Sequence, residues 1–390
     1  MAILPRLKPR CFYDLVVEVA IVRPGPIQGG MVHPYLRRRN GEEEPDLPHP
    51  SLRPILERTL GVPLFQEQVM KLAIVGAGYS PGEADQLRRD MAAWRKSGRL
   101  ERHRQRLLDG FAKNGIPLEF GERLYEQIKG FGEYGFPESH AASFAILVYA
   151  STWLKTHFCG FFHCALLNSL PMGFYAPAQI VADAQKHRVQ VRPVDVNHAD
   201  WDCTMEGARD HALRLGLRLV KGLGEDVGRR IEADRKQRGP FGDVSELVRR
   251  CELDKKARHA LARAGALDGL ATHRRAAVWE AMQKQPPLLR AVPDDDASAL
   301  LKPPSASELL LLDYGTVGLS LDDHPMRHVR PLLPKDTWGS KDVMAATQGA
   351  RGNVCGLVIG RQRPGTADGT CFVTLEDEHG MVNVIVWGRD

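Results

Sequence analysis

Short helical segments, separated by breaks that contain glycine, make up most of this chain. Between Ile55 and Ile128 apolar residues recur mostly at helical spacing, and the pattern breaks at Gly61, at Gly76–Gly78 and at Asn114–Pro117. Glycine lacks a Cβ atom and adopts positive φ, so such breaks favour the end of one helix and the start of the next. The sequence therefore predicts a series of short helices in this region.

Helix-start signals place several of these elements. Ser80 is expected to cap a helix in which Glu83 is the third residue, and Asp243 is expected to cap another. A further helix is predicted to begin near Asp254. Residues 139–168 are predicted to form a helix as well, since apolar residues dominate this stretch.

The last forty residues change to the period of a β-strand. Three strands are predicted, at Val354–Ile359, Thr370–Leu375 and Met381–Trp387. Short strands with basic turns suit an OB-like barrel, which can bind single-stranded nucleic acid, although any small β-domain would show the same pattern. The predicted fold class is therefore mainly α with a C-terminal partial β-barrel.

Composition limits the class of protein further. The chain has 390 residues, 43% hydrophobic and 26% charged, which indicates a globular protein of two to four domains. No apolar run reaches the length of a membrane span, and the N-terminus lacks a signal-peptide pattern, so no membrane partner is expected. Seven scattered cysteines fit reduced thiols, and we expect a cytoplasmic protein.

Signals for metal binding and catalysis are weak. Cys159 and His163 are four residues apart and could share a helix face, but three phenylalanines surround them and no second ligand pair follows. A buried apolar helix explains this segment better than a zinc site does. No catalytic motif is present, so we assign no catalytic residue and no metal ligand.

A cluster of basic residues points to a polyanionic partner. Between Asp85 and Arg106 eight Lys or Arg residues are interrupted by only three acids, and Arg88, Arg89, Arg95 and Lys96 belong to this cluster. Adjacent arginines project about 100° apart on a helix, so both can hold one triphosphate only if it lies across the helix. A solvated helix face is the alternative.

A second candidate site is the turn Lys221-Gly222-Leu223-Gly224. In a helix–hairpin–helix, the glycines let backbone N–H groups approach a phosphate of duplex DNA without reading its sequence. Lys221, Arg229 and Arg230 lie beside the turn and strengthen this interpretation. A plain turn between two helices remains the alternative.

The segment Phe131–His140 is a loop rich in glycine and aromatic residues that precedes a predicted helix. Ser139 could cap that helix, and His140 could donate a hydrogen bond to a phosphate at its N-terminus. From residue type alone, Tyr134 and Phe136 are more often core anchors and His140 a structural histidine.

Several motifs, in the same order, resemble bacterial C-family DNA polymerases, the family of the polymerase III alpha subunit. They include the segment Asp14–Gln28, Ala84–Arg89, Gly132–Ala142, Lys221–Gly224 and Ala264–Leu267. The resemblance is nearest to the error-prone, damage-tolerant branch. Replicative members usually carry Asn-Lys-Ser-His where this chain has Pro137-Glu-Ser-His140, so one phosphate contact cannot be transferred to Glu138.

The resemblance implies roles for the matching positions. Arg88, Arg89, Tyr134, Ser139 and His140 would line the site of the incoming nucleotide. Arg23–Pro26 would form the turn that leaves the palm. The hairpin at Gly222 and Gly224, with its neighbouring basic residues, would contact the upstream duplex, and Arg95 and Lys96 would add DNA contacts in the fingers.

The family's three catalytic aspartates would lie before Arg23–Pro26, outside this chain. We therefore expect a fragment of the enzyme, inactive alone, while the complete polymerase would use Mg²⁺ for nucleotidyl transfer in translesion synthesis, repair and replication. The expected parts of the chain are the palm-to-fingers junction, the fingers, the helix–hairpin–helix region, a linker and a truncated OB domain, at residues 1–35, 36–170, 171–284, 285–345 and 346–390.

The same resemblance implies partners. They are primer–template DNA, dNTP, a sliding clamp and accessory mutagenesis proteins. Residues Gln285–Leu289 faintly resemble a clamp-binding peptide, and a proline-rich linker explains them equally well. Two other functional classes stay open from the sequence, namely a stand-alone DNA-binding module without catalysis and a protein-interaction scaffold.

Overall fold

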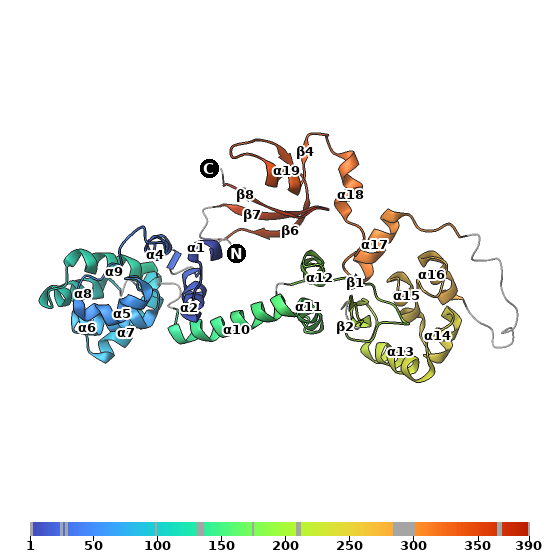
Figure 1. Cartoon of the computed structure of the whole chain (residues 1–390), viewed down its shortest axis with the longest axis horizontal. Helices are drawn as coiled ribbons and strands as arrows, with labels where there is room; N and C mark the ends of the chain where they lie inside the picture. Colours follow the sequence, from blue (N-terminus) through green and yellow to red (C-terminus); the bar gives the residue numbers. More distant parts are fainter. Residues whose placement is uncertain are drawn as a thin grey trace. The chain divides into compact units, whose positions relative to one another are not determined.

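The structure is a computed structural model. It describes residues 3–23, 26–27, 30–97, 100–130, 136–173, 175–207, 212–283, 301–364 and 369–388, except the side chains of residues 92–97 and 130. The chain divides into two units, Met1–Leu154 and Lys155–Asp390, and each is described by itself. Helices predominate, and a three-stranded antiparallel sheet lies near the C-terminus (Figure 1), which confirms the predicted fold class.

Among its described residues, the first unit contains α-helices and 3-10 turns joined by loops, and no strand. Its helices are α1 (Leu4–Leu7), α2 (Phe12–Ile21), α4 (Val32–Arg39), α5 (Arg53–Leu56), α6 (Gln66–Ala77), α7 (Pro81–Ser97), α8 (Glu101–Lys113), α9 (Leu118–Gly130) and α10 (Glu138–His157), the last of which extends into the second unit, with 3-10 turns η1 (Pro50–Leu52) and η2 (Glu57–Thr59). The breaks between α6 and α7 and between α8 and α9 fall at the predicted turns Gly76–Gly78 and Asn114–Pro117, whereas the break between α7 and α8 was not predicted.

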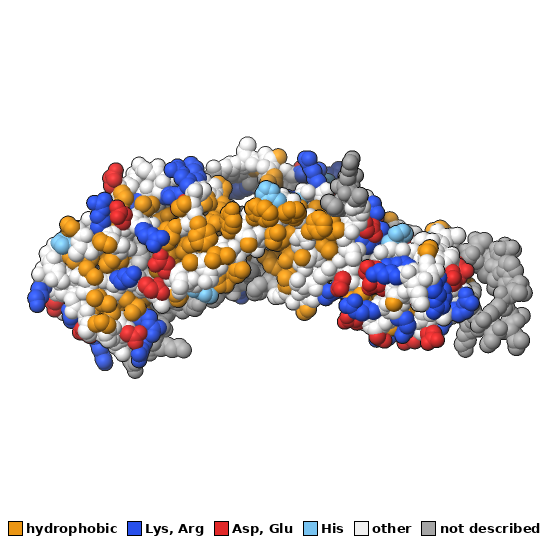
Figure 2. All heavy atoms as spheres, turned by 60° about the horizontal axis from the view of Figure 1, so that its bottom comes forward, with side chains coloured by type: hydrophobic (Ala, Val, Ile, Leu, Met, Phe, Trp, Pro, Cys, Tyr) orange, Lys and Arg blue, Asp and Glu red, His pale blue; other side chains and the backbone are white. Residues whose placement is uncertain are grey.

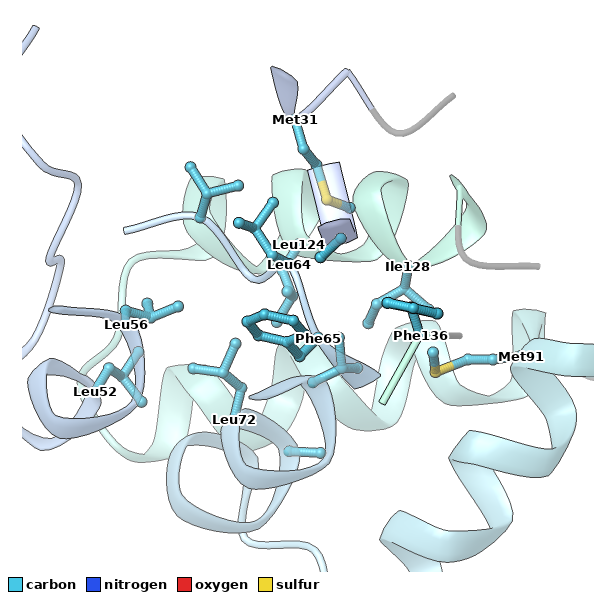
Figure 3. Packing of buried hydrophobic residues seen from close by; sticks show 14 of the residues in the cluster. Met31, Leu52, Leu56, Leu64, Phe65, Leu72, Met91, Leu124, Ile128 and Phe136 are labelled. Carbon is cyan, nitrogen blue, oxygen red and sulfur yellow. The ribbon is translucent and has the colours of Figure 1, made fainter. Parts of the chain in front are cut away.

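One hydrophobic core holds the first unit together. Phe65 is fully buried among residues of several helices, and Phe136, just before α10, lies beside Met91 of α7 (Figure 3). α6 and α8 cross closely because Gly110 lacks a side chain: a Cβ atom there would lie 2.2 Å from the carbonyl oxygen of Ala77. This packing fixes α7, which carries the predicted arginine pair, against the rest of the unit.

The second unit combines helices with small sheets. Its helices are α11 (Cys159–Asn168), α12 (Pro177–Lys186), α13 (Glu225–Arg238), α14 (Val244–Arg250), α15 (Lys255–Arg263), α16 (Arg274–Met282), α17 (Ala306–Thr316), α18 (Pro325–Val329) and α19 (Ser340–Ala345), with 3-10 turns η4 (Leu217–Leu219) and η5 (Arg330–Leu332). Its strands are β1 (Val191–Arg192), β2 (Thr204–Glu206), β3 (Ala212–Arg214), β4 (Thr337–Trp338), β5 (Asn353–Val354), β6 (Leu357–Gln362), β7 (Cys371–Glu376) and β8 (Met381–Val386).

The strands form three separate sheets. In the first, β3 pairs with β1 in parallel and with β2 in antiparallel orientation. β4 and β5 form a short parallel pair, and β6-β7-β8 is an antiparallel sheet with a register shift between Val358 and Gly360. The three predicted C-terminal strands are thus present, shifted by a few residues, and β8 is an edge strand.

A buried carboxylate closes the turn between β7 and β8. Asp377 accepts hydrogen bonds from the backbone N–H and hydroxyl of Ser340, both at 2.6 Å, and from the N–H groups of His379 and Gly380. Burial alone would raise the pKa of Asp377, but these hydrogen bonds outweigh it and lower the pKa to about 2. The carboxylate therefore ties α19 to the sheet.

The sequence predicted one continuous helix over residues 139–168, and this prediction is wrong. The structure has two helices, α10 and α11, which separate at Phe158. Gly160 lies so close to β2 that a Cβ atom there would be 2.6 Å from the Cε atom of Met205. α11 thus follows its packing against β2, which the local sequence does not show.

Other helix-start predictions are confirmed. Asp243 accepts from the N–H of Glu246 at 2.7 Å, and Asp254 caps α15. The predicted domain boundaries stay predictions. Within the predicted linker, residues 285–300 lie outside the described residues, and α17 to α19 follow. Among the described residues, every helix falls short of the length or the apolar character needed to cross a membrane.

Candidate nucleic-acid and nucleotide interface

The turn at Lys221–Gly224 has the backbone of a helical hairpin. Gly222 has φ +86°, a conformation that L side chains rarely adopt, and Gly224 is the N-cap of α13. Val220 and Leu223 are buried and fix the turn to the core, while Gly222 and Gly224 are exposed. The N-terminus of α13 and the backbone of the turn are therefore exposed, and binding of a phosphate there stays a prediction.

Interactions within the chain occupy the basic residues that the sequence placed beside this turn. Lys221 Nζ donates to the carbonyl oxygen of Tyr314 at 3.0 Å. Arg229 pairs with Glu225 at 2.7 Å, and Arg230 donates to the carbonyl oxygen of Cys251 at 2.8 Å. A phosphate would have to compete with these partners.

Lys256 is a basic residue of the hairpin that sequence reasoning missed. It lies in the first turn of α15, and its Cε atom is 3.9 Å from the position that a Cβ atom of Gly222 would take. Lys256 is exposed and makes no hydrogen bond or ion pair with any residue that the structure describes. The pair Lys255-Lys256 after the cap Asp254 is the one local signal that could have suggested it.

The arginine pair of α7 converges on one carboxylate. Arg88 Nε donates to one oxygen of Asp85 at 3.0 Å, and Arg89 Nη2 donates to the other at 2.6 Å. These hydrogen bonds lower the pKa of Asp85. Arg88 and Arg89 remain partly exposed, so the geometry shows that adjacent arginines on this helix can hold one anion together.

α7 is held in place by contacts at its N-terminus and in its middle. Ser80 and Glu83 form the predicted capping box, with N–H to side-chain distances of 2.7 and 3.2 Å. The buried carboxylate of Asp90 contacts His103 Nε2 of α8 at 3.0 Å. Arg95 and Lys96 lie in α7, but their side chains are outside the described residues.

The start of α10 brings together residues from distant parts of the first unit. The guanidinium of Arg23 lies 4.7 Å from the centroid of the ring of Phe136, which comes just before α10. The ring of His140 packs edge-on between Phe136 and Phe144, at 5.1 and 4.7 Å between centroids. Tyr134 is among residues 131–135, outside the described residues.

Ser139 is not the cap of α10. The helix begins at Glu138, and Ser139 lies inside the first turn, where its carbonyl oxygen accepts from the hydroxyl of Ser143 at 3.0 Å. The backbone N–H of Glu138 donates to a carboxylate oxygen of Glu67 at 3.0 Å. Ser139 and His140 are both exposed at this helix N-terminus.

The side chain of Glu138 accepts a hydrogen bond from within the protein. The hydroxyl of Tyr13 donates to Glu138 Oε1 at 2.7 Å, and Arg58 lies over the Tyr13 ring at 3.9 Å. Burial, followed by the contact with Glu138, raises the pKa of Tyr13. The sequence does not reveal this link, because Tyr13, Arg58 and Glu138 are far apart along the chain.

The zinc candidate at Cys159 and His163 is part of no larger cluster of ligands. The described residues contain no group of three or more His, Cys, Asp or Glu that could hold a metal ion. His163 Nε2 contacts Asp183 at 2.8 Å and Nδ1 contacts the carbonyl oxygen of Cys159 at 2.7 Å. Both ring nitrogens of His163, the histidine of the candidate zinc site, thus have protein partners.

Comparison with known proteins identifies the class of this chain. Residues 1–115 match the finger domain of the bacterial DNA polymerase III alpha subunit, and residues 188–277 match a helix–hairpin–helix motif. Residues 1–115 are therefore similar to the finger domain of this family, which confirms the resemblance.

Relatives with more than half of the aligned residues identical include error-prone DNA polymerases. The chain is 58% identical to the error-prone DNA polymerase of Pseudomonas fluorescens (strain Pf0-1), over 99% of its own length and 38% of that protein. It is 55% identical to the error-prone DNA polymerase of Alkalilimnicola ehrlichii, again over 99% of this chain and 38% of the relative. The chain thus spans less than two-fifths of the length of these relatives.

Proposed function

We propose that this chain is the part of an error-prone DNA polymerase that binds the incoming nucleotide and the primer–template duplex. The parent reaction would be nucleotidyl transfer during translesion synthesis and DNA repair in the cytoplasm, with a sliding clamp and accessory mutagenesis proteins as further partners. The close similarity to error-prone polymerases over 99% of this chain supports the proposal.

The observation that carries the DNA-binding role is the hairpin. An exposed left-handed glycine, the N-terminus of α13 and the side chain of Lys256 all lie at one turn, and Lys256 pairs with no residue that the structure describes. Backbone N–H groups and one cation suit a DNA phosphate, and such contacts position a duplex without reading its bases.

The arginine pair supports the nucleotide-binding role. Arg88 and Arg89 already hold the two oxygens of Asp85, and a triphosphate would replace this carboxylate with more negative charge. Ser139 and His140 at the N-terminus of α10 would add contacts from a second helix of the first unit.

The C-terminal sheet suits a single-stranded template. One face of β6-β7-β8 carries a shallow hollow of about 350 Å³ whose lining includes Gln362, Phe372, Asn383 and Ile385. Phe372 is 40% exposed, and an exposed aromatic ring beside amide side chains favours stacking and hydrogen bonding with bases. This face supports the OB-like role proposed for the domain.

A stand-alone DNA-binding module is less favoured, because almost the entire chain aligns with error-prone DNA polymerases. We propose that the chain binds DNA but does not extend a primer by itself.

The test measures both properties on the same protein. Fluorescence anisotropy with a labelled primer–template, over a series of salt concentrations, should show binding that weakens steeply with salt. Primer extension with Mg²⁺ and dNTPs should be absent. Extension would show that catalytic carboxylates lie within this chain. A folded chain, by circular dichroism, that fails to bind would refute the DNA-binding role.

A further inference from the structure

Arg23 is a half-buried arginine whose guanidinium has no acidic partner among the described residues. Most described arginines of the first unit pair with Asp or Glu, as Arg39 does with Asp14 at 2.6 Å. On the face drawn in Figure 2, basic side chains are likewise interspersed with acidic ones. The other described arginines of this unit that lack an acidic partner are exposed, namely Arg6, Arg10 and Arg102.

This combination points to an anionic ligand. An arginine that is partly removed from water is normally paired, because its charge and its five N–H donors lose hydration. The side chain of Arg23 makes no hydrogen bond with any residue that the structure describes. Its donors are therefore available to an anion.

An aromatic ring fixes the position of this guanidinium. Its central carbon lies 4.7 Å from the centroid of the Phe136 ring, and Phe136 is fully buried. A cation over a ring face is attracted by the ring electrons, and a buried ring cannot follow the motion of a surface side chain. Stacking also leaves the N–H groups of the guanidinium free at its edge.

The same ring contacts both helices that carry the predicted nucleotide-binding residues. The ring of His140 in α10 packs edge-on against Phe136, with 5.1 Å between centroids. On α7, Met91 lies beside Phe136 (Figure 3). Arg88 is three residues before Met91 and so lies on the same side of that helix. All of these residues belong to the first unit.

The number of positive groups selects the ligand. Arg88 and Arg89 together already bind the two oxygens of one carboxylate, that of Asp85. Arg23 adds a third guanidinium from another segment, and His140 is exposed beside it. A triphosphate, with charged oxygens on three linked phosphates, can bind several such groups at once, whereas a single carboxylate cannot.

We propose that Arg23 is a further residue that binds the phosphates of the incoming nucleotide, and that Phe136 positions it. This role rests on the proposed function, because it assumes that Arg88, Arg89 and His140 bind a nucleotide. The turn after α2, for which the family resemblance implies only a connection to the palm, thereby gains a part in nucleotide binding.

Calorimetric titration of the chain with a dNTP and with inorganic triphosphate tests the role of Arg23. Arg23→Gln should weaken the binding of both ligands about ten-fold, because a charge-assisted hydrogen bond is lost. The loss should be the same for both, since inorganic triphosphate has no sugar or base. A loss for the dNTP alone would overturn the assignment to the phosphates.

Arg58→Gln is the matched control. The substitution changes the net charge equally, and Arg58 also stacks on an aromatic ring, that of Tyr13, at 3.9 Å. Its guanidinium lies 3.9 Å from a carboxylate oxygen of Glu138 in the first turn of α10. Because this carboxylate already compensates Arg58, the affinity for triphosphate should change less than about two-fold. Equal weakening by Arg23→Gln and Arg58→Gln would reduce the effect to net charge and overturn the role of Arg23.

Arg23→Lys separates binding from folding. Lysine keeps a cation over the Phe136 ring but loses the planar fork of donors, so triphosphate should bind more weakly while the melting temperature stays unchanged. Unchanged binding by both Arg23 variants would refute the role of Arg23 and leave the proposed nucleotide site standing. If the folded, unsubstituted chain binds neither ligand, the nucleotide-binding role itself fails, and the role of Arg23 fails with it.

Discussion

Replacing Lys256 by Gln should weaken the binding of primer–template DNA by about eight-fold at 0.1 M salt. Lys256 is the exposed cation next to Gly222, and no described residue neutralises it. The hairpin backbone itself is unchanged by the substitution, so the loss would report one phosphate contact.

The magnitude follows from counterion release. One lost phosphate contact lowers the slope of log K against log salt concentration by about 0.9 for duplex DNA. Between 0.1 M and 1 M salt, where the electrostatic contribution vanishes, this slope gives a factor of about 8, or about 1.2 kcal/mol. Arg229→Gln should cost less, because Arg229 already pairs with Glu225 at 2.7 Å and has Asp202 at 3.7 Å.

The assay is fluorescence anisotropy at several salt concentrations, with Lys255→Gln as the matched control. Lys255 is the neighbouring residue of the same helix turn, so the change in net charge is identical while the side chain points about 100° away. The reasoning is refuted if Lys255→Gln and Lys256→Gln lower the salt slope equally, or if neither changes it.

Three further substitutions test the packing, the C-terminal domain and the arginine pair. Gly110→Ala should lower the free energy of unfolding by about 1–3 kcal/mol in chemical denaturation, because its Cβ atom would clash with the carbonyl oxygen of Ala77. Asp377→Asn should destabilise the protein at pH 7 by about 2 kcal/mol in the same assay, since the native pKa of about 2 is below its ordinary value of 3.8. Asp85→Asn should strengthen the binding of a dNTP several-fold in a calorimetric titration, because it frees both arginines from a competing carboxylate.

Each of these has its own control. Gly82→Ala, in a helix position with open space around it, should stabilise the protein by up to about 1 kcal/mol, and an equal loss at both glycines would contradict the packing argument. The ionised Asp377 contributes fully to the free energy of unfolding above about pH 4, and this contribution is lost as the pH falls toward 2. The difference in the free energy of unfolding between the unsubstituted protein and Asp377→Asn must therefore narrow over that pH range. Weaker dNTP binding by Asp85→Asn would mean that Asp85 orients the arginines rather than competing for them.

Much of the fold could be predicted because it depends on local signals. The capping box at Ser80 and the cap at Asp243 form within one helical turn, and the predicted breaks at Gly76–Gly78 and Asn114–Pro117 end α6 and α8. The convergence of Arg88 and Arg89 on Asp85 is local as well, since residues three and four apart share a helix face. The family motifs identified the class of protein for the same reason, because they are short stretches of contiguous sequence.

The tertiary structure decided which distant residues meet. Lys256 reaches Gly222 only because α15 packs beside the hairpin, and Glu138 is held by Tyr13 only because α2 lies near the start of α10. The break at Phe158 depends on the approach of Gly160 to β2, which no local pattern encodes. Sequence by itself determined the caps and turns at which several helices start and end, and which residues are apolar. Packing determined which distant residues meet, because contacts between distant segments form only when the chain has folded.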